Sequence, residues 1–207
     1  MKVTNTPDTI QFGWKFYIHS KITQKAVDEL IKCPPQIAES ADKSVIGEIS
    51  RAILYMRTRI KRITPLQNGV RTGYIKHIEN MSEAFKNSSN SQEGYKEAGR
   101  ALHILQDMTY PGRNSFSLNN IFRRFFWGET QFQSSVDDIY QDVIDSYSSG
   151  YKSKSNTFIE LFDETLSRTQ TVSAPNKTNK NSWFLYTIKA IDISIDSTKR
   201  FLELLNK

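Results

Sequence analysis

Residues 99–111 read Gly99-Arg-Ala-Leu-His103-Ile-Leu-Gln-Asp107-Met-Thr-Tyr-Pro111, a run typical of the last turns of an α-helix. A helix places His103 and Asp107, four residues apart, on one face with one side chain above the other. Pro111 ends the helix. Because imidazole nitrogen and carboxylate oxygen both bind zinc, the pair predicts two ligands of a metal site. A buried histidine hydrogen-bonded to an aspartate would give the same pattern, and the spacing alone leaves both interpretations open.

Helical periodicity extends through most of the chain. Between residues 40 and 62, apolar side chains recur at intervals that form one stripe: Val45, Ile49, Ala52, Ile53, Met56 and Ile60. Further helices are predicted over 23–32, 73–85, 92–107, 134–147, 157–166 and 183–205, with loops at 64–69, 87–91 and 148–156. No alternating strand pattern competes with these. The sequence therefore predicts an all-α, single-domain helical bundle whose metal ligands project inward from several helices.

The chain length fits one domain with a sizeable core. We predict a single α-helical domain over residues 1–207, with a flexible lead-in at 1–13 and a polar loop at 169–182 before the last helix. The single cysteine, Cys33, excludes an intrachain disulfide bond. No apolar run is long enough to span a membrane, and residues 1–8 lack the apolar core of a signal peptide.

The helix end around His103 resembles the signature helix of the zinc-dependent phospholipases C and the related fungal single-strand nucleases. In those families a Leu-His-x-x-x-Asp run is followed by a short turn that contains Pro. A second segment, Tyr17-Ile-His19-Ser-Lys-Ile-Thr23-Gln-Lys-Ala26, is similar to the family's first helix, where a His precedes Ile-Thr-x-x-Ala. His77 lies between these segments, as the family's middle His does. All three histidines of the chain thus match, and the resemblance covers about residues 14–113.

The resemblance implies a set of zinc ligands. It implies His19 for one ion, and His77, His103 and Asp107 for another, with Asp107 able to bridge the two. The family also uses a carboxylate between its first and second His, for which Asp42 is the best candidate. In this interpretation Asp107 or Asp42 orients the attacking water, while zinc lowers the pKa of that water to about 7 and polarises a phosphoryl oxygen.

The chain departs from the family pattern in ways that remove ligands. Gly112-Arg113 stands where the family has a further His, and no His follows His103. We therefore expect one zinc ion, at most two, rather than the family's three. Arg113 can replace the lost positive charge, because guanidinium pairs with phosphate through two hydrogen bonds. Some relatives begin with a Trp whose amino group binds metal, but Trp14 is internal here and we interpret it as a packing residue.

Two segments are candidate partner surfaces. Residues 51–76 hold no acid and seven bases, in a chain of net charge +6: Arg51, Arg57, Arg59, Lys61, Arg62, Arg71 and Lys76. Such a segment attracts phospholipid headgroups or nucleic acid, although a solvated helix face has the same composition. Residues 122–127 read Phe122-Arg-Arg-Phe-Phe-Trp127, a mixture suited to a membrane interface or to base stacking. The same cluster can also belong to the core.

The sequence therefore leads to one main functional hypothesis and two alternatives. The main one is a zinc-dependent phosphodiester hydrolase of the phospholipase C type that acts on membrane phospholipid, as a secreted toxin or a delivered effector domain. One alternative is a single-strand nuclease. The other is a metal-free, catalytically inactive helical module that keeps the fold and binds an acidic partner through its basic face.

Overall fold

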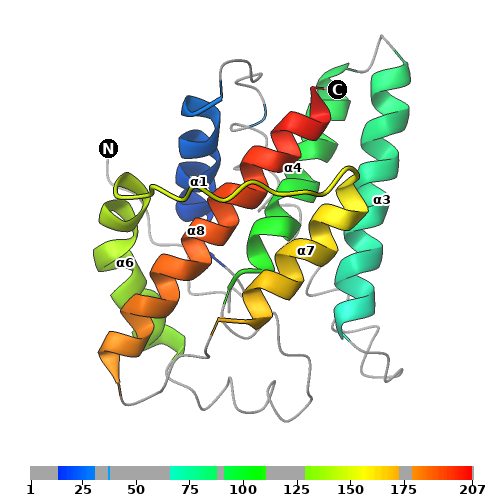
Figure 1. Cartoon of the computed structure of the whole chain (residues 1–207). Coiled ribbons are helices and arrows are strands. Elements are labelled where there is room, and N and C mark those ends of the chain that lie inside the picture. Colours follow the sequence, from blue (N-terminus) through cyan, green and yellow to red (C-terminus); the bar gives the residue numbers. More distant parts are fainter. Residues whose placement is uncertain are drawn as a thin grey trace, which may run out of the picture.

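A computed structural model describes residues 14–30, 37, 66–87, 91–110, 129–172 and 179–206, and these residues form helices and loops without strands. The all-α prediction is confirmed for this part of the chain. The helices are α1 (Phe16–Asp28), α3 (Leu66–Lys86), α4 (Ser91–Asp107), α6 (Glu129–Asp145), α7 (Phe158–Gln170) and α8 (Lys180–Leu205). They pack as one bundle, with α8 running obliquely across it (Figure 1).

Helix α8 is the centre of the packing. It contacts α1, α4, α6 and α7, and it supplies a large share of the apolar core. Between Ala190 and Thr198 every residue except Asp192 is buried, as expected of a helix surrounded by others. Its apolar contributions to the core include Trp183, Tyr186, Ala190, Ile191, Ile195, Phe201 and Leu202. Asn179 caps its first turn by accepting a hydrogen bond from the backbone N–H of Asn181.

Helices α3 and α4 form an antiparallel pair. Phe85, near the end of α3, packs edge to face on Tyr95 at the start of α4, with ring centroids 5.2 Å apart. Gly94 admits this contact, because a Cβ atom there would lie 2.7 Å from Cε1 of Phe85. At the other end of the pair, a Cβ atom added at Gly73 would lie 3.9 Å from Cδ1 of Ile104, an ordinary contact distance. The pair therefore holds the His103 end of α4 against the start of α3.

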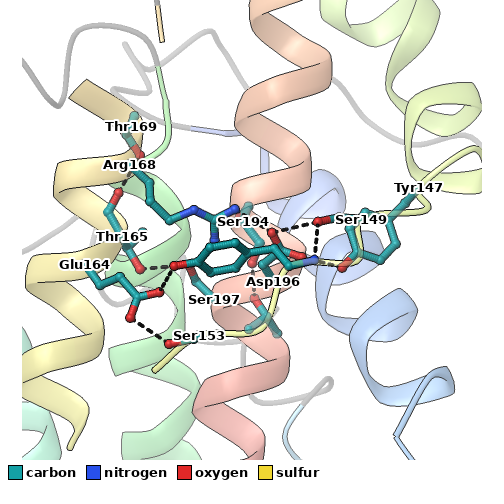
Figure 2. A network of polar contacts seen from close by, with 12 residues as sticks. Tyr147, Ser149, Ser153, Glu164, Thr165, Arg168, Thr169, Ser194, Asp196 and Ser197 are labelled. Atoms are coloured by element: carbon teal, nitrogen blue, oxygen red, sulfur yellow. Dashed lines mark hydrogen bonds and ion pairs between the residues drawn. The ribbon is translucent and has the colours of Figure 1, made fainter. Parts of the chain in front are cut away.

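The loop between α6 and α7, residues 146–157, crosses α8 (Figure 1). Tyr147 and Ser149 donate hydrogen bonds to the buried Asp196 of α8, at 2.5 and 3.1 Å, and Arg168 of α7 pairs with the same carboxylate at 2.6 Å (Figure 2). Further along the loop, Ser153 donates to Glu164 of α7 at 2.8 Å. This α6–α7 loop is thus fixed to two helices although it has no regular structure.

Several predicted boundaries are wrong. Helix α1 begins at Phe16 instead of residue 23, because the buried stripe Ile18, Ile22 and Ala26 continues toward the N-terminus. Helix α3 begins at Leu66, inside the segment predicted to be a loop at 64–69. Helix α7 continues to Gln170, into the predicted polar loop at 169–182. The lead-in 1–13, the predicted helix 40–62 and residues 173–178 lie outside the described residues.

None of the described helices has a stretch that is both long and apolar enough to cross a membrane.

Candidate metal centre

Two helices bring His19, His103 and Asp107 together. One ligand atom from each lies within 4.8 Å of the others, and the three side chains are buried. We call these residues the His–His–Asp group. His19 comes from α1, while His103 and Asp107 come from consecutive turns at the end of α4. Within the part of the chain that the structure describes, this is the only such cluster of potential metal ligands, and it can hold an ion.

Each oxygen of the Asp107 carboxylate faces one imidazole nitrogen. Oδ1 lies 3.3 Å from Nε2 of His19, and Oδ2 lies 3.4 Å from Nε2 of His103. The two imidazole rings lie partly over each other, with centroids 4.1 Å apart and an interplanar angle of 35°. Two nitrogens and one carboxylate thus converge on a common point from two helices. This donor set matches the three protein ligands of catalytic zinc sites such as His₂Glu.

The protonation state of His19 follows from its neighbours. Nδ1 lies 2.7 Å from Oε1 of Gln106, an oxygen that only accepts, so Nδ1 carries the proton. Burial lowers the pKa of His19 and the neighbouring His103 lowers it further, although Asp107 and Gln106 act in the opposite direction. His19 is therefore neutral, with its lone pair on Nε2. That is the form of histidine that binds metal ions.

The lone pair on Nε2 of His19 is buried and meets another acceptor. Among the described residues this atom has no hydrogen-bond partner, although Oδ1 of Asp107 lies only 3.3 Å away. Leaving a buried polar atom unsatisfied costs about 1–3 kcal/mol. Two acceptors that face each other at this distance also repel, and a cation bound by both removes that repulsion. The residues present therefore fit a metal ion.

Trp14 holds the aspartate from the N-terminal side of α1. Its backbone N–H donates to Oδ1 of Asp107 at 3.1 Å, and its indole N–H donates to Oγ1 of Thr109 at 2.9 Å. The indole ring also packs edge to face on Tyr110, with centroids 5.2 Å apart. Trp14 is buried, as its interpretation as a packing residue predicts. Its contact with Asp107 could not be predicted from the sequence, because a backbone N–H donor does not depend on residue type.

The structure does not bring His77 into the His–His–Asp group, although the resemblance implies it as a ligand. Its Nδ1 lies 2.6 Å from Oε2 of Glu97, which also receives a longer hydrogen bond from Asn80 at 3.4 Å and pairs with Arg100. Glu97 precedes His103 by six residues, or about 9 Å along the axis of α4. Burial raises the pKa of Glu97, but the hydrogen bond from His77 and the charge of Arg100 outweigh it, so the pKa is lowered. The contact between His77 and Glu97 ties α3 to α4.

Other predicted site residues lie outside the described part of the chain. These are Asp42, Arg113, the aromatic segment 122–127 and the basic residues from Arg51 to Arg62. Of the basic segment, the structure describes Arg71 and Lys76. Arg71 makes two hydrogen bonds to Asp163 of α7, at 3.1 and 3.2 Å, so it serves the packing of α3 on α7, while Lys76 is exposed.

Comparisons of this chain with protein-family models, with curated proteins and with solved structures find no match. The resemblance to the zinc-dependent phospholipases C and single-strand nucleases thus rests on the residues quoted for it and remains a prediction.

Proposed function

We propose that this protein is a metal-dependent phosphodiester hydrolase of the phospholipase C type, with zinc as its metal and membrane phospholipid as its substrate. One observation carries the proposal: the buried, neutral His19 turns an unpartnered Nε2 toward a carboxylate oxygen 3.3 Å away, beside a second imidazole. Two acceptors with no proton between them repel each other, and a cation that both of them bind removes this repulsion.

The choice of metal rests on the donor set together with the resemblance. Two imidazoles and one carboxylate suit zinc, and they also suit divalent iron in sites with open positions. Zinc supplies a water of lowered pKa and polarises a phosphoryl oxygen. The chain's own residues divide the remaining tasks: His19 and His103 donate nitrogen lone pairs, and one oxygen of Asp107 remains able to orient a water. Asp42 and Arg113 are our candidates for a fourth ligand and for the phosphate-binding cation.

Phospholipid is preferred over single-stranded nucleic acid because of the aromatic and arginine residues at 122–127. That composition suits contact with a lipid interface, and it follows the metal-ligand helix closely in sequence. The basic residues at 51–62 add attraction for phosphate of either kind.

The first experiment is metal analysis by mass spectrometry on purified protein, after zinc loading and removal of excess metal. We expect about one zinc per chain, lost in His103→Ala and in Asp107→Ala. The matched control is His77→Ala, which removes a histidine of α3 outside the His–His–Asp group and should leave the zinc in place. Parallel loading with divalent iron decides the metal. Absence of bound metal in the natural protein under all these conditions would overturn the proposal.

The second experiment separates the substrates. Release of phosphorylcholine from phosphatidylcholine vesicles is measured beside cleavage of single-stranded DNA, with His103→Ala as the inactive reference. Lipid hydrolysis that His103→Ala abolishes supports the proposal, while DNA cleavage alone would assign the nuclease branch. If the zinc-loaded protein shows neither activity, the proposed hydrolysis is refuted.

The burial of the His–His–Asp group favours one other function, a helical binding module in which the metal is structural and only stabilises the fold. His19 is 0% exposed, Asp107 1% and His103 5%, whereas a catalytic ion needs a position open to substrate. This candidate predicts bound metal that stabilises the fold without any hydrolysis of either substrate. The activity assays on zinc-loaded protein therefore separate it from the main proposal.

A further inference from the structure

Gln106 on α4 links the His–His–Asp group to Thr23 of α1 and to one further helix, α8. Its side chain is 1% exposed and makes three hydrogen bonds. Oε1 lies 2.7 Å from Nδ1 of His19 on α1, and Nε2 donates to Oγ1 of Thr23 at 2.8 Å and to Oγ1 of Thr198 on α8 at 3.1 Å. Each polar atom of the amide thus has a partner.

The hydrogen bonds of Thr198, on the side of the amide away from His19, fix the orientation of this amide. The hydroxyl of Thr198 donates its hydrogen to the carbonyl oxygen of Ser194 at 2.7 Å, so its oxygen is left to accept from Gln106. The donor facing Thr198 must be the amide nitrogen, and the acceptor facing His19 must be the amide oxygen. A turned amide would place an oxygen against an oxygen at Thr198 and an N–H against the N–H of His19.

This chain of hydrogen bonds determines which nitrogen of His19 is available. An amide oxygen accepts a hydrogen bond but does not take up the proton, so the proton stays on Nδ1 and the lone pair stays on Nε2. Nε2 is the nitrogen that faces Asp107 and the second imidazole. His77 offers a contrast within the same chain. Its Nδ1 lies next to the carboxylate of Glu97, and His77 does not belong to the His–His–Asp group.

We propose that Gln106 is a positioning residue that selects the Nδ1–H tautomer of His19 and so presents Nε2 as a metal ligand. Thr23 and Thr198 hold the amide of Gln106 in the orientation this requires. The inference rests on the proposed function as far as the metal is concerned. The choice of tautomer, however, can be measured on metal-free protein, so the two can fail separately.

The test of the tautomer uses ¹⁵N-labelled, metal-free protein and long-range ¹H–¹⁵N spectra of the imidazole rings. The chain has only three histidines, and a His77→Gln and a His103→Gln variant assign the signals by elimination. We expect protonated Nδ1 and unprotonated Nε2 in His19. Gln106→Met, which keeps side-chain length and removes the acceptor, should shift His19 toward the Nε2–H tautomer. Gln106→Glu, which in its protonated form keeps an acceptor toward His19 and a donor toward Thr198, should retain Nδ1–H.

The test of the metal uses zinc affinity, measured by competition with a chromophoric chelator. Gln106→Met should weaken zinc binding by about 10- to 100-fold, the usual effect of removing an outer-shell partner, and Gln106→Glu should restore most of it. Gln141→Met is the matched control, because Gln141 on α6 bonds Asp145 and should leave zinc affinity unchanged.

Each outcome has one meaning. If Gln106→Met leaves both the zinc affinity and the His19 tautomer unchanged, the inference is overturned. If the natural protein binds no zinc, the proposed function is overturned, and the tautomer spectra alone then test the role of Gln106. If Gln106→Met does not fold, the double variant Thr23→Val/Thr198→Val frees the amide to turn. In that case both tautomers of His19 should be populated, and an unchanged Nδ1–H tautomer would overturn the inference that Thr23 and Thr198 fix the amide and thereby the tautomer.

Discussion

Asp107 has two tasks at the level of the single residue, and two substitutions separate them. Its carboxylate is a candidate metal ligand, and its Oδ1 also accepts the backbone N–H of the buried Trp14 at 3.1 Å. Asparagine keeps an oxygen for that N–H but lacks the negative charge, whereas alanine removes both. The residue therefore contributes to the fold as well as to the site.

We expect metal-free Asp107→Ala to be less stable than metal-free Asp107→Asn by about 1–3 kcal/mol, because alanine leaves the N–H of Trp14 buried and unsatisfied. Urea unfolding of both variants in the presence of chelator measures the difference. Both variants should lose zinc. Equal stability of the two would show that the Trp14 hydrogen bond contributes little.

The antiparallel pair of α3 and α4 offers a comparison between two glycines at the level of the element. Alanine in place of a helical glycine normally stabilises by about 0.5–1 kcal/mol. At Gly73 the new methyl group would meet only Ile104 at 3.9 Å, so Gly73→Ala should be neutral or stabilising. At Gly94 it would lie 2.7 Å from the ring of Phe85, and such overpacking costs about 1–3 kcal/mol.

Gly94→Ala is therefore expected to lower the free energy of unfolding, opposite in sign to Gly73→Ala. Thermal and urea unfolding of the two variants measure the contrast. Adding Phe85→Leu to Gly94→Ala should recover part of the loss, because the smaller side chain vacates the space. A stabilising effect of Gly94→Ala would mean that the ring of Phe85 turns aside at no cost.

The α6–α7 loop gives a pH dependence of stability. Burial raises the pKa of Glu164, but hydrogen bonds from Ser155, Tyr151 and Ser153 and the charge of Arg168 outweigh it, so the pKa is lowered from 4.5. A pKa lower in the folded state means that the unfolded chain binds the proton more readily. The stabilisation is therefore complete above pH 4.5 and is lost as the pH falls through the lower, folded-state value.

Glu164→Gln should flatten this part of the stability profile, which urea unfolding between about pH 3 and 6 records. The matched control is Glu203→Gln on α8, which changes a more exposed carboxylate paired with Arg200. A profile of Glu164→Gln with the same slope as the natural protein would contradict the role assigned to the carboxylate.

At the scale of the whole molecule, metal binding and folding should be coupled. The His–His–Asp group joins α1 to α4, so an ion bound there stabilises only the folded chain. Zinc at a free concentration of 100 times its dissociation constant should add about 2.7 kcal/mol of stability. Scanning calorimetry with zinc and with chelator tests this, and His103→Ala should show no response. An unchanged melting temperature in the natural protein would argue against binding.

Much of the architecture could be predicted from the sequence, and the errors have local physical causes. Helical periodicity predicted the described helices, but boundaries failed where composition misled. Gly69 lies inside α3, because the local preference of one glycine is weak and tertiary context can override it. The pair His103 and Asp107 was predictable because helical spacing fixes which side chains meet. His19 was added to the pair only through the resemblance, and the structure does not bring His77 to them. Spacing within a chain does not say where a second helix crosses.

Gln106 and Trp14 were beyond prediction for a different reason. Gln106 stands next to Asp107 in the sequence, yet its partners Thr23 and Thr198 lie 83 and 92 residues away. A glutamine of this kind cannot be told from any other until the helices are packed. Outer-shell residues are therefore found from structure, whereas ligands can be found from sequence.

The central place of α8 sets an order of events during synthesis of the chain. The ribosome delivers α1, α3, α4, α6 and α7 before α8, the helix on which α1, α4, α6 and α7 pack. The α3–α4 hairpin can assemble early because its contacts are near in sequence, but Thr198 reaches Gln106 only after nearly the whole described chain has emerged. Nascent chains that stall before α8 will expose the apolar faces of four helices, so they are expected to be the forms that chaperones hold and proteases remove.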